Sequence, residues 1–185
     1  MKKGVYGLFM LLNISYKEKM SYKNKVYVSM DADNDLKYYN LMKAWKQNDN
    51  SSFNFYDAHG INNIYDKSEE SIKAGLQERF RNTKVFVLLV GEHTKYLYKY
   101  VRWEIEQAIK RGIPCIVVNL NGKRSMDQER CPALMRDHLA VHISFNAKIL
   151  QYALENWPYS EEQHKKNNES GAYYYKDSVY KELGL

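Results

Sequence analysis

The sequence predicts an α/β protein with a doubly wound, five-stranded parallel sheet and helices on both faces. Three observations point to this fold class. A chain of 185 residues can bury one core without disulfide support. Strand-like and helix-like segments alternate along the chain, as in parallel βαβ units. The most apolar segment, residues 85–90, lacks polar alternation, which is typical of a central parallel strand covered on both faces.

Two strand–helix units are predicted before this central strand. The first strand is β-branched and aromatic, and the helix after it has apolar side chains at helical spacing. A short aromatic strand and a loop lead to a second helix, for which Asp66 and Ser68 are the two candidate caps. The strands span residues 25–30 and 53–56, the first helix spans 35–47, and the second carries the stripe Ile72, Leu76 and Phe80.

After the central strand the alternation continues. A helical stripe is closed by Gly112 and Pro114. A fourth buried strand, a polar loop and a shorter fifth strand follow, and a last helix closes the domain at Pro158. The stripe consists of Leu97, Val101, Ile105, Ala108 and Ile109; the strands span 115–118 and 139–143, the loop 119–132 and the last helix 147–157.

The α/β domain is predicted to span residues 25–158, after an N-terminal extension over residues 1–24. Residues 159–185 form a C-terminal extension with two predicted parts. The polar segment 161–171 is expected to be a linker. A final docked helix is expected over residues 173–183.

Composition and the N-terminal segment favour a cytoplasmic protein. The only cysteines, Cys115 and Cys131, form neither a disulfide framework nor a CxxC motif. The apolar run over residues 5–12 is too short to span a bilayer and lacks a small-residue cleavage site, so we expect Met20 to be the native start. The net charge of +6 is spread among interleaved acidic and basic residues, which argues against nucleic acid and membranes as partners.

Candidate ligand-binding residues follow from the fold. Ligands of an open doubly wound sheet bind beyond the carboxyl ends of the strands, where the strand order reverses. Glu104 borders the buried stripe of the helix after the central strand, so partial burial would raise its pKa. The alternative is a surface glutamate paired with a basic residue one turn away. The strand ends contribute Ser29, Met30, Asp31 and Asp57.

Two short motifs resemble a known family. The segment 100–105, Tyr-Val-Arg-Trp-Glu-Ile, is similar to the aromatic-x-x-x-Glu-aliphatic signature of TIR domains. The segment 28–31, Val-Ser-Met-Asp, is similar to the end of the first strand in the same group. The order of elements from Lys25 to Trp157 resembles the TIR-like proteins of bacterial Thoeris antiphage systems, the ThsB type, which have a flavodoxin-like fold.

This resemblance implies an enzyme that processes NAD. It would be an NAD glycohydrolase or ADP-ribosyl cyclase in which Glu104 is catalytic and no metal or further cofactor takes part. Glu104 would stabilise an oxocarbenium-like transition state as nicotinamide leaves, and Ser29 and Asp31 would line the nicotinamide end. Met30 and Asp57 would complete the pocket, and Tyr100 and Trp103 would either stack on the ligand or pack in the core.

The same resemblance implies a set of partners. These are NAD or a related nucleotide, a phage-protein trigger, a second copy of the chain in a homo-oligomer, and an effector reached through a diffusible ADP-ribose-derived product. The competing interpretation is a TIR-like module that binds a nucleotide or a protein without catalysis.

The sequence argues against a receiver domain, against the common nucleotide-binding motifs and against a histidine metal site. A receiver domain would end the third strand in aspartate, but that strand ends in Val90 and Gly91. Neither a GxGxxG motif nor a P-loop occurs. His138 and His142 stand four apart on a predicted strand, without acidic or cysteine company, so a metal site is not expected there.

Overall fold

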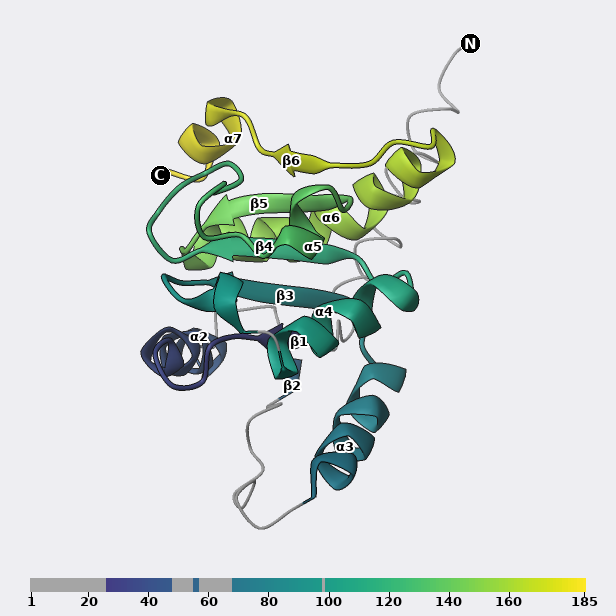
Figure 1. Cartoon of the computed structure of the whole chain (residues 1–185). Coiled ribbons are helices and arrows are strands. Elements are labelled where there is room, and N and C mark those ends of the chain that lie inside the picture. The colour runs from purple at the N-terminus through teal and green to yellow at the C-terminus, as the bar shows by residue number, and fades with distance from the viewer. Residues whose placement is uncertain (1–25, 48–54, 57–67, 98) are drawn as a thin grey trace.

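A computed structural model describes residues 26–47, 55–56, 68–97 and 99–185 of the chain. All strands of the described part are parallel and form one sheet in the order β2-β1-β3-β4-β5-β6 (Figure 1). The predicted doubly wound parallel sheet is therefore confirmed, with a sixth strand added at one edge.

The elements follow one another as alternating strands and helices. The strands are β1 (Val26–Ser29), β2 (Phe55–Tyr56), β3 (Val85–Val90), β4 (Cys115–Asn119), β5 (Ala140–Ser144) and β6 (Ala172–Tyr174). The helices are α2 (Leu36–Gln47), α3 (Glu69–Arg81), α4 (Tyr100–Lys110), α5 (Ala133–Arg136), α6 (Ala147–Lys166) and α7 (Asp177–Glu182), with a 3₁₀ turn, η1 (Thr94–Tyr96), before α4.

The sheet separates two apolar cores. Alternate side chains of a strand point to opposite faces, so Val26 and Val28 pack with α2, α6 and α7, whereas Tyr27 packs with α3, α4 and α5. All six residues of β3 are buried, as predicted for the central strand. Helices therefore cover both faces of the sheet.

The strand order reverses between β1 and β3. From β1 the chain leads to β2 on one side, and from β2 it returns to β3 on the other side. The carboxyl ends of β1 and β3 lie next to each other, with Ser29 in register with Leu88. This is the position at which ligands of doubly wound sheets bind.

The C-terminal part differs from the prediction. Helix α6 continues through Pro158 to Lys166 rather than ending at Trp157. The predicted linker is therefore partly helical, and the predicted last helix is replaced by β6, which pairs with β5, and by the shorter α7. Lys165 stabilises the extended helix, because its ammonium group pairs with Glu161 (3.0 Å) and donates to the carbonyl of Gly112 (3.1 Å).

Smaller differences concern the segments around α4. Leu97 was predicted as part of this helix but lies in the connection after η1, and α4 begins at Tyr100. The short helix α5 lies where a loop ending at Pro132 was predicted to lead directly to the fifth strand. Ser68, one of the two candidate caps, caps α3 by accepting a hydrogen bond from the Ser71 amide (3.3 Å).

Some predictions fall outside the described residues. These are the N-terminal extension with Met20, residues 53–54 of the predicted second strand, the loop with Asp57, and the alternative cap Asp66. None of the helices in the described ranges is both long and apolar enough to cross a membrane.

Candidate functional site

Glu104 lies in the second turn of α4 and is only 4% exposed. Helix α4 follows β3 and packs on the sheet through Val101, Ile105 and Ala108. Glu104 is adjacent to this apolar stripe, so the helix carries its carboxylate toward β1 rather than into solvent. The alternative of an exposed, salt-bridged glutamate is wrong.

Two hydroxyl groups of β1 hold the Glu104 carboxylate. The Tyr27 hydroxyl donates to Oε1 (2.6 Å), and the Ser29 hydroxyl donates to Oε2 (2.5 Å). Residues two apart on a strand point to the same face, which is why both side chains reach the same carboxyl group. Each oxygen of Glu104 thus has one donor from the first strand, directly beside the switch point.

Burial changes the protonation of this carboxyl group. Desolvation raises the pKa of Glu104 from 4.5 to about 7, although the hydrogen bonds from Ser29 and Tyr27 lower it. The neighbouring phenol of Tyr27 has a raised pKa, because it is buried and lies beside Glu104, and it therefore remains a donor at neutral pH. A carboxyl group that titrates near neutrality is suited to proton transfer or to the stabilisation of a cation.

The other first-strand residues point to different places. Met30 is 2% exposed and lies in the core on the opposite face, with α2, so the structure does not bring it to Glu104. Asp31 is also buried, and its carboxylate accepts hydrogen bonds from the amides of Asp33 (3.1 Å) and Asn34 (3.3 Å). It orders the loop after β1. Asp57 lies outside the described residues.

The aromatic residues of α4 pack in the core. Trp103 is half-buried, and its ring meets that of Phe80 of α3 edge-on, with centroids 6.2 Å apart. Tyr100 is half-buried and packs against the same core. Of the two predicted roles, packing is the one that these contacts support.

Tyr27 is the residue of this site that the sequence interpretation missed. The signal was available in the strand alternation, because Tyr27 and Ser29 share a face and Met30 belongs to the other. Tyr27 is itself fixed by stacking on Phe80 at 4.2 Å. The second hydroxyl donor to Glu104 therefore belongs to a ring that is itself packed in the core.

A second buried carboxylate lies at the same edge of the sheet. Asp35 packs against Gly91 at the end of β3, where an added Cβ would lie 2.3 Å from its Oδ2. Burial and the neighbouring Asp31 raise the pKa of Asp35 to about 6, whereas His93 lowers it. The loops after β1 and β3 are thus fitted closely together beside the switch point.

The two histidines that stand four apart lie in different surroundings. His142 is fully buried on β5, and neither of its ring nitrogens has a hydrogen-bond partner. His138 is half-buried in the connection before β5. In the described ranges, no three His, Cys, Asp or Glu side chains come together in a metal-binding group.

The chain has a parallel sheet whose order reverses between β1 and β3, and a buried glutamate from the helix after β3 is held against β1. This arrangement fits a TIR-like domain. The family model described as "Thoeris protein ThsB, TIR-like domain" matches residues 15–125. This match covers more than half of the 185 residues, and the chain belongs to the ThsB TIR-like family. The resemblance noted in the sequence is confirmed, and the matched segment contains Tyr27, Ser29 and Glu104.

Proposed function

We propose that this protein cleaves the bond between nicotinamide and ribose in NAD and produces an ADP-ribose-derived signalling nucleotide in antiphage defence. The observation that carries the proposal is the buried carboxylate of Glu104, with a pKa of about 7, beside the switch point of the sheet. Membership of the ThsB TIR-like family supports the same reaction class.

The proposed chemistry assigns Glu104 an electrostatic role. When the bond from ribose C1′ to the pyridinium nitrogen breaks, its electron pair leaves with neutral nicotinamide, and the ribose becomes an oxocarbenium-like cation. An ionised Glu104 stabilises that cation and binds the ribose hydroxyls. The hydrogen bonds from Tyr27 and Ser29 favour the ionised carboxylate that this step needs.

The cation is then trapped by one of three nucleophiles. Water gives ADP-ribose and releases a proton. A nucleophilic atom within the same ligand gives a cyclic product, and a second molecule gives a conjugate. Each product retains the two phosphates of NAD and can diffuse to a downstream effector.

Nicotinamide release from NAD tests the proposal. The full chain is incubated with NAD, alone and with lysate of phage-infected cells as a source of trigger, and nicotinamide is quantified by liquid chromatography. We expect release by the wild type in at least one condition. Glu104→Gln should lower the rate by about 100-fold or more, because the carboxamide cannot carry the negative charge.

Glu106→Gln is the matched control. Glu106 lies on the same helix and is exposed, and it accepts from Arg102 (3.0 Å) rather than from β1. Its substitution should leave nicotinamide release unchanged. Release that is absent in both conditions, or equal in wild type and Glu104→Gln, would contradict catalysis by this site.

A non-catalytic nucleotide-binding module is the second candidate function. The occupation of both oxygens of Glu104 by hydroxyl donors of β1 favours this alternative, because a purely structural carboxylate would be held in the same way. Calorimetric binding of NAD without nicotinamide release would favour the module over the enzyme.

A further inference from the structure

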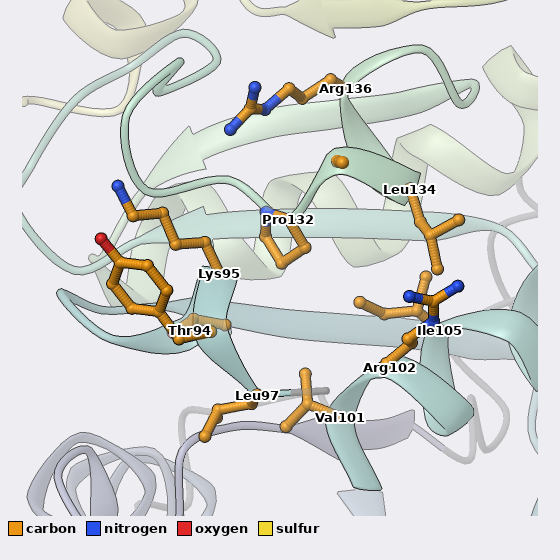
Figure 2. A pocket seen from close by; sticks show the side chains of 11 residues that line it. Thr94, Lys95, Leu97, Val101, Arg102, Ile105, Pro132, Leu134 and Arg136 are labelled. Atoms are coloured by element: carbon orange, nitrogen blue, oxygen red, sulfur yellow. The ribbon is translucent and has the colours of Figure 1, made fainter. Parts of the chain in front are cut away.

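A groove opens on the side of α4 that faces α5, away from the contact between Glu104 and β1. It has a volume of about 220 Å³ and lies between η1, the first two turns of α4, and α5. Figure 2 shows Leu97 and Val101 below this space, Leu134 reaching in from α5, and Pro132 between them. Glu104 does not line it.

The floor of the groove is apolar, and apolar side chains also stand exposed on its rim. Val101, Ile105 and Pro132 are buried. Tyr96 is 55% exposed and Leu134 is 37% exposed. Exposed apolar side chains gathered around a hollow are typical of a binding surface.

The charged residues of the groove all have the same sign. Lys95, Arg102 and Arg136 line it, and no acidic side chain does so within the described part of the chain. Lys95 and Arg136 lie on one side, and Arg102 lies beside Leu134 on the other (Figure 2). The groove therefore has cations on both sides of an apolar floor.

Arg136 is held in place while its outer nitrogens remain available. Its Nε donates to the carbonyl of Cys131 (3.0 Å), which fixes the guanidinium group beside α5. The Nε of Arg102 donates to the carboxylate of Glu106, and the Arg102 side chain is more than half exposed. Arginine with tyrosine around an apolar centre is the composition at which binding energy concentrates in protein interfaces.

The volume of the groove limits the size of the anionic ligand that can bind in it. Sites for small molecules and cofactors typically measure roughly 300–1,000 Å³, so about 220 Å³ is too little for a dinucleotide. It is sufficient for one or two side chains of a peptide whose backbone stays at the rim. The volume and charge of the groove thus fit a segment of a protein.

We propose that this groove binds an acidic segment of a partner protein, which inserts an apolar side chain between Val101 and Leu134 and places carboxylates against Lys95 and Arg136. This site is separate from the Glu104 site. Its existence does not depend on NAD cleavage.

Selection from a displayed library of random 12-residue peptides tests the proposal. The immobilised full chain is the target, and affinities of the enriched peptides are measured by fluorescence anisotropy. We expect enriched peptides to combine Asp or Glu with a central Leu, Phe or Trp. Their affinity should fall as salt rises from about 50 to about 300 mM, because the charges at the rim are screened.

Variants of the groove locate the binding site. Lys95→Glu and Leu134→Ser should each weaken binding about tenfold, the first through charge repulsion and the second through loss of the apolar contact. Arg81→Glu on α3 and Leu41→Ser on α2 are the matched controls, since both residues are exposed and lie on other elements. They should bind like the wild type.

Three outcomes would overturn the proposal. The first is a selection that enriches no acidic peptides. The second is binding that is unaffected by both Lys95→Glu and Leu134→Ser while circular dichroism shows both variants to be folded. The third is self-association of the wild type that Leu134→Ser abolishes, because the occupant would then be a second copy of the chain.

Discussion

At the scale of single residues, the contact of Tyr27 and Ser29 with Glu104 joins strand β1 to helix α4. Two opposing effects determine the protonation of Glu104. Burial favours the neutral carboxyl group, whereas the two hydroxyl donors favour the charged one. The charge of this group is therefore adjustable by small changes around it.

Removing one donor should raise the pKa of Glu104. In the wild type we expect the titration of the Glu104 carboxyl group to have its midpoint near pH 7. Tyr27→Phe keeps the ring on Phe80 but loses the hydrogen bond to Oε1, so the midpoint should rise by about one unit. Titration of the carboxyl carbon by NMR measures it, and Tyr174→Phe at an exposed position is the control. An unchanged midpoint in Tyr27→Phe would contradict this account of the donor.

The burial of Glu104 should cost stability at alkaline pH. Its pKa is higher in the folded chain, about 7, than the ordinary 4.5. The folded state therefore binds more protons between these values, and stability is lost as the pH rises through about 7. Glu104→Gln, which cannot ionise, should be more stable than the wild type by about 2–3 kcal/mol at pH 8 and by little at pH 5.

Urea unfolding at the two pH values measures this difference. Glu106→Gln is again the control, because Glu106 is exposed. A stability advantage of Glu104→Gln that did not grow with pH would show that the carboxyl group is not buried as described.

At the scale of elements, continuous apolar runs and regular stripes were predictable. The strand Val85–Val90 and the helix Leu36–Gln47 lie where the sequence places them. The extension of α6 beyond Trp157 was not predictable, because a proline such as Pro158 normally ends a helix. One of the two contacts of Lys165 that hold the continuation is to the carbonyl of Gly112, which is distant in the sequence. The three residues of β6 are too few to show a period.

Helix α7 should be essential for stability although it lies in the C-terminal extension. Tyr180 is 1% exposed, accepts a hydrogen bond from the Ser144 amide (3.4 Å), and has the Arg124 guanidinium 4.1 Å above its ring. Tyr180→Ala should lower the free energy of unfolding by roughly 3–5 kcal/mol. Tyr174→Ala, at a side chain that is 63% exposed, should change it by less than about 0.5 kcal/mol.

Chemical denaturation of both variants measures the effect. Equal stability of Tyr180→Ala and wild type would show that α7 does not contribute to the core. Loss of the folded state in Tyr180→Ala alone would agree with the expected result.

At the scale of the whole molecule, the response to acid should depend on His142. Burial lowers the pKa of His142 from 6.5 to about 4. Its contribution to stability is therefore fully present above about pH 6.5 and is lost as the pH falls through about 4. His142→Phe removes the titrating ring and its unpartnered nitrogens. The free energy of unfolding of the variant, relative to that of the wild type, should therefore be about 2 kcal/mol higher at pH 5 than at pH 8.

Thermal unfolding at pH 5 and pH 8 measures this change. His164→Phe is unsuitable as a control, since His164 bonds to Glu169. His93→Phe is unsuitable as well, because His93 lowers the pKa of Asp35. Tyr174→Phe, at a side chain that is 63% exposed, is the control. A relative stability that does not depend on pH would contradict the burial of a neutral His142.

The whole fold was more predictable than the site, for a physical reason. Periodicity reports which residues are buried, and burial is sufficient to define a parallel sheet with helices on both faces. The site depends on which buried side chains meet across the sheet. Glu104 was found through the motif around it, but its contact with Tyr27 depends on the packing of α4 over β1.

Helix α4 presents Glu104 to β1 and presents Val101 and Ile105 to the groove beside α5. A compound that filled the groove would therefore leave the contact between Glu104 and β1 in place. It would compete with the proposed partner segment and not with the nucleotide proposed to bind at Glu104.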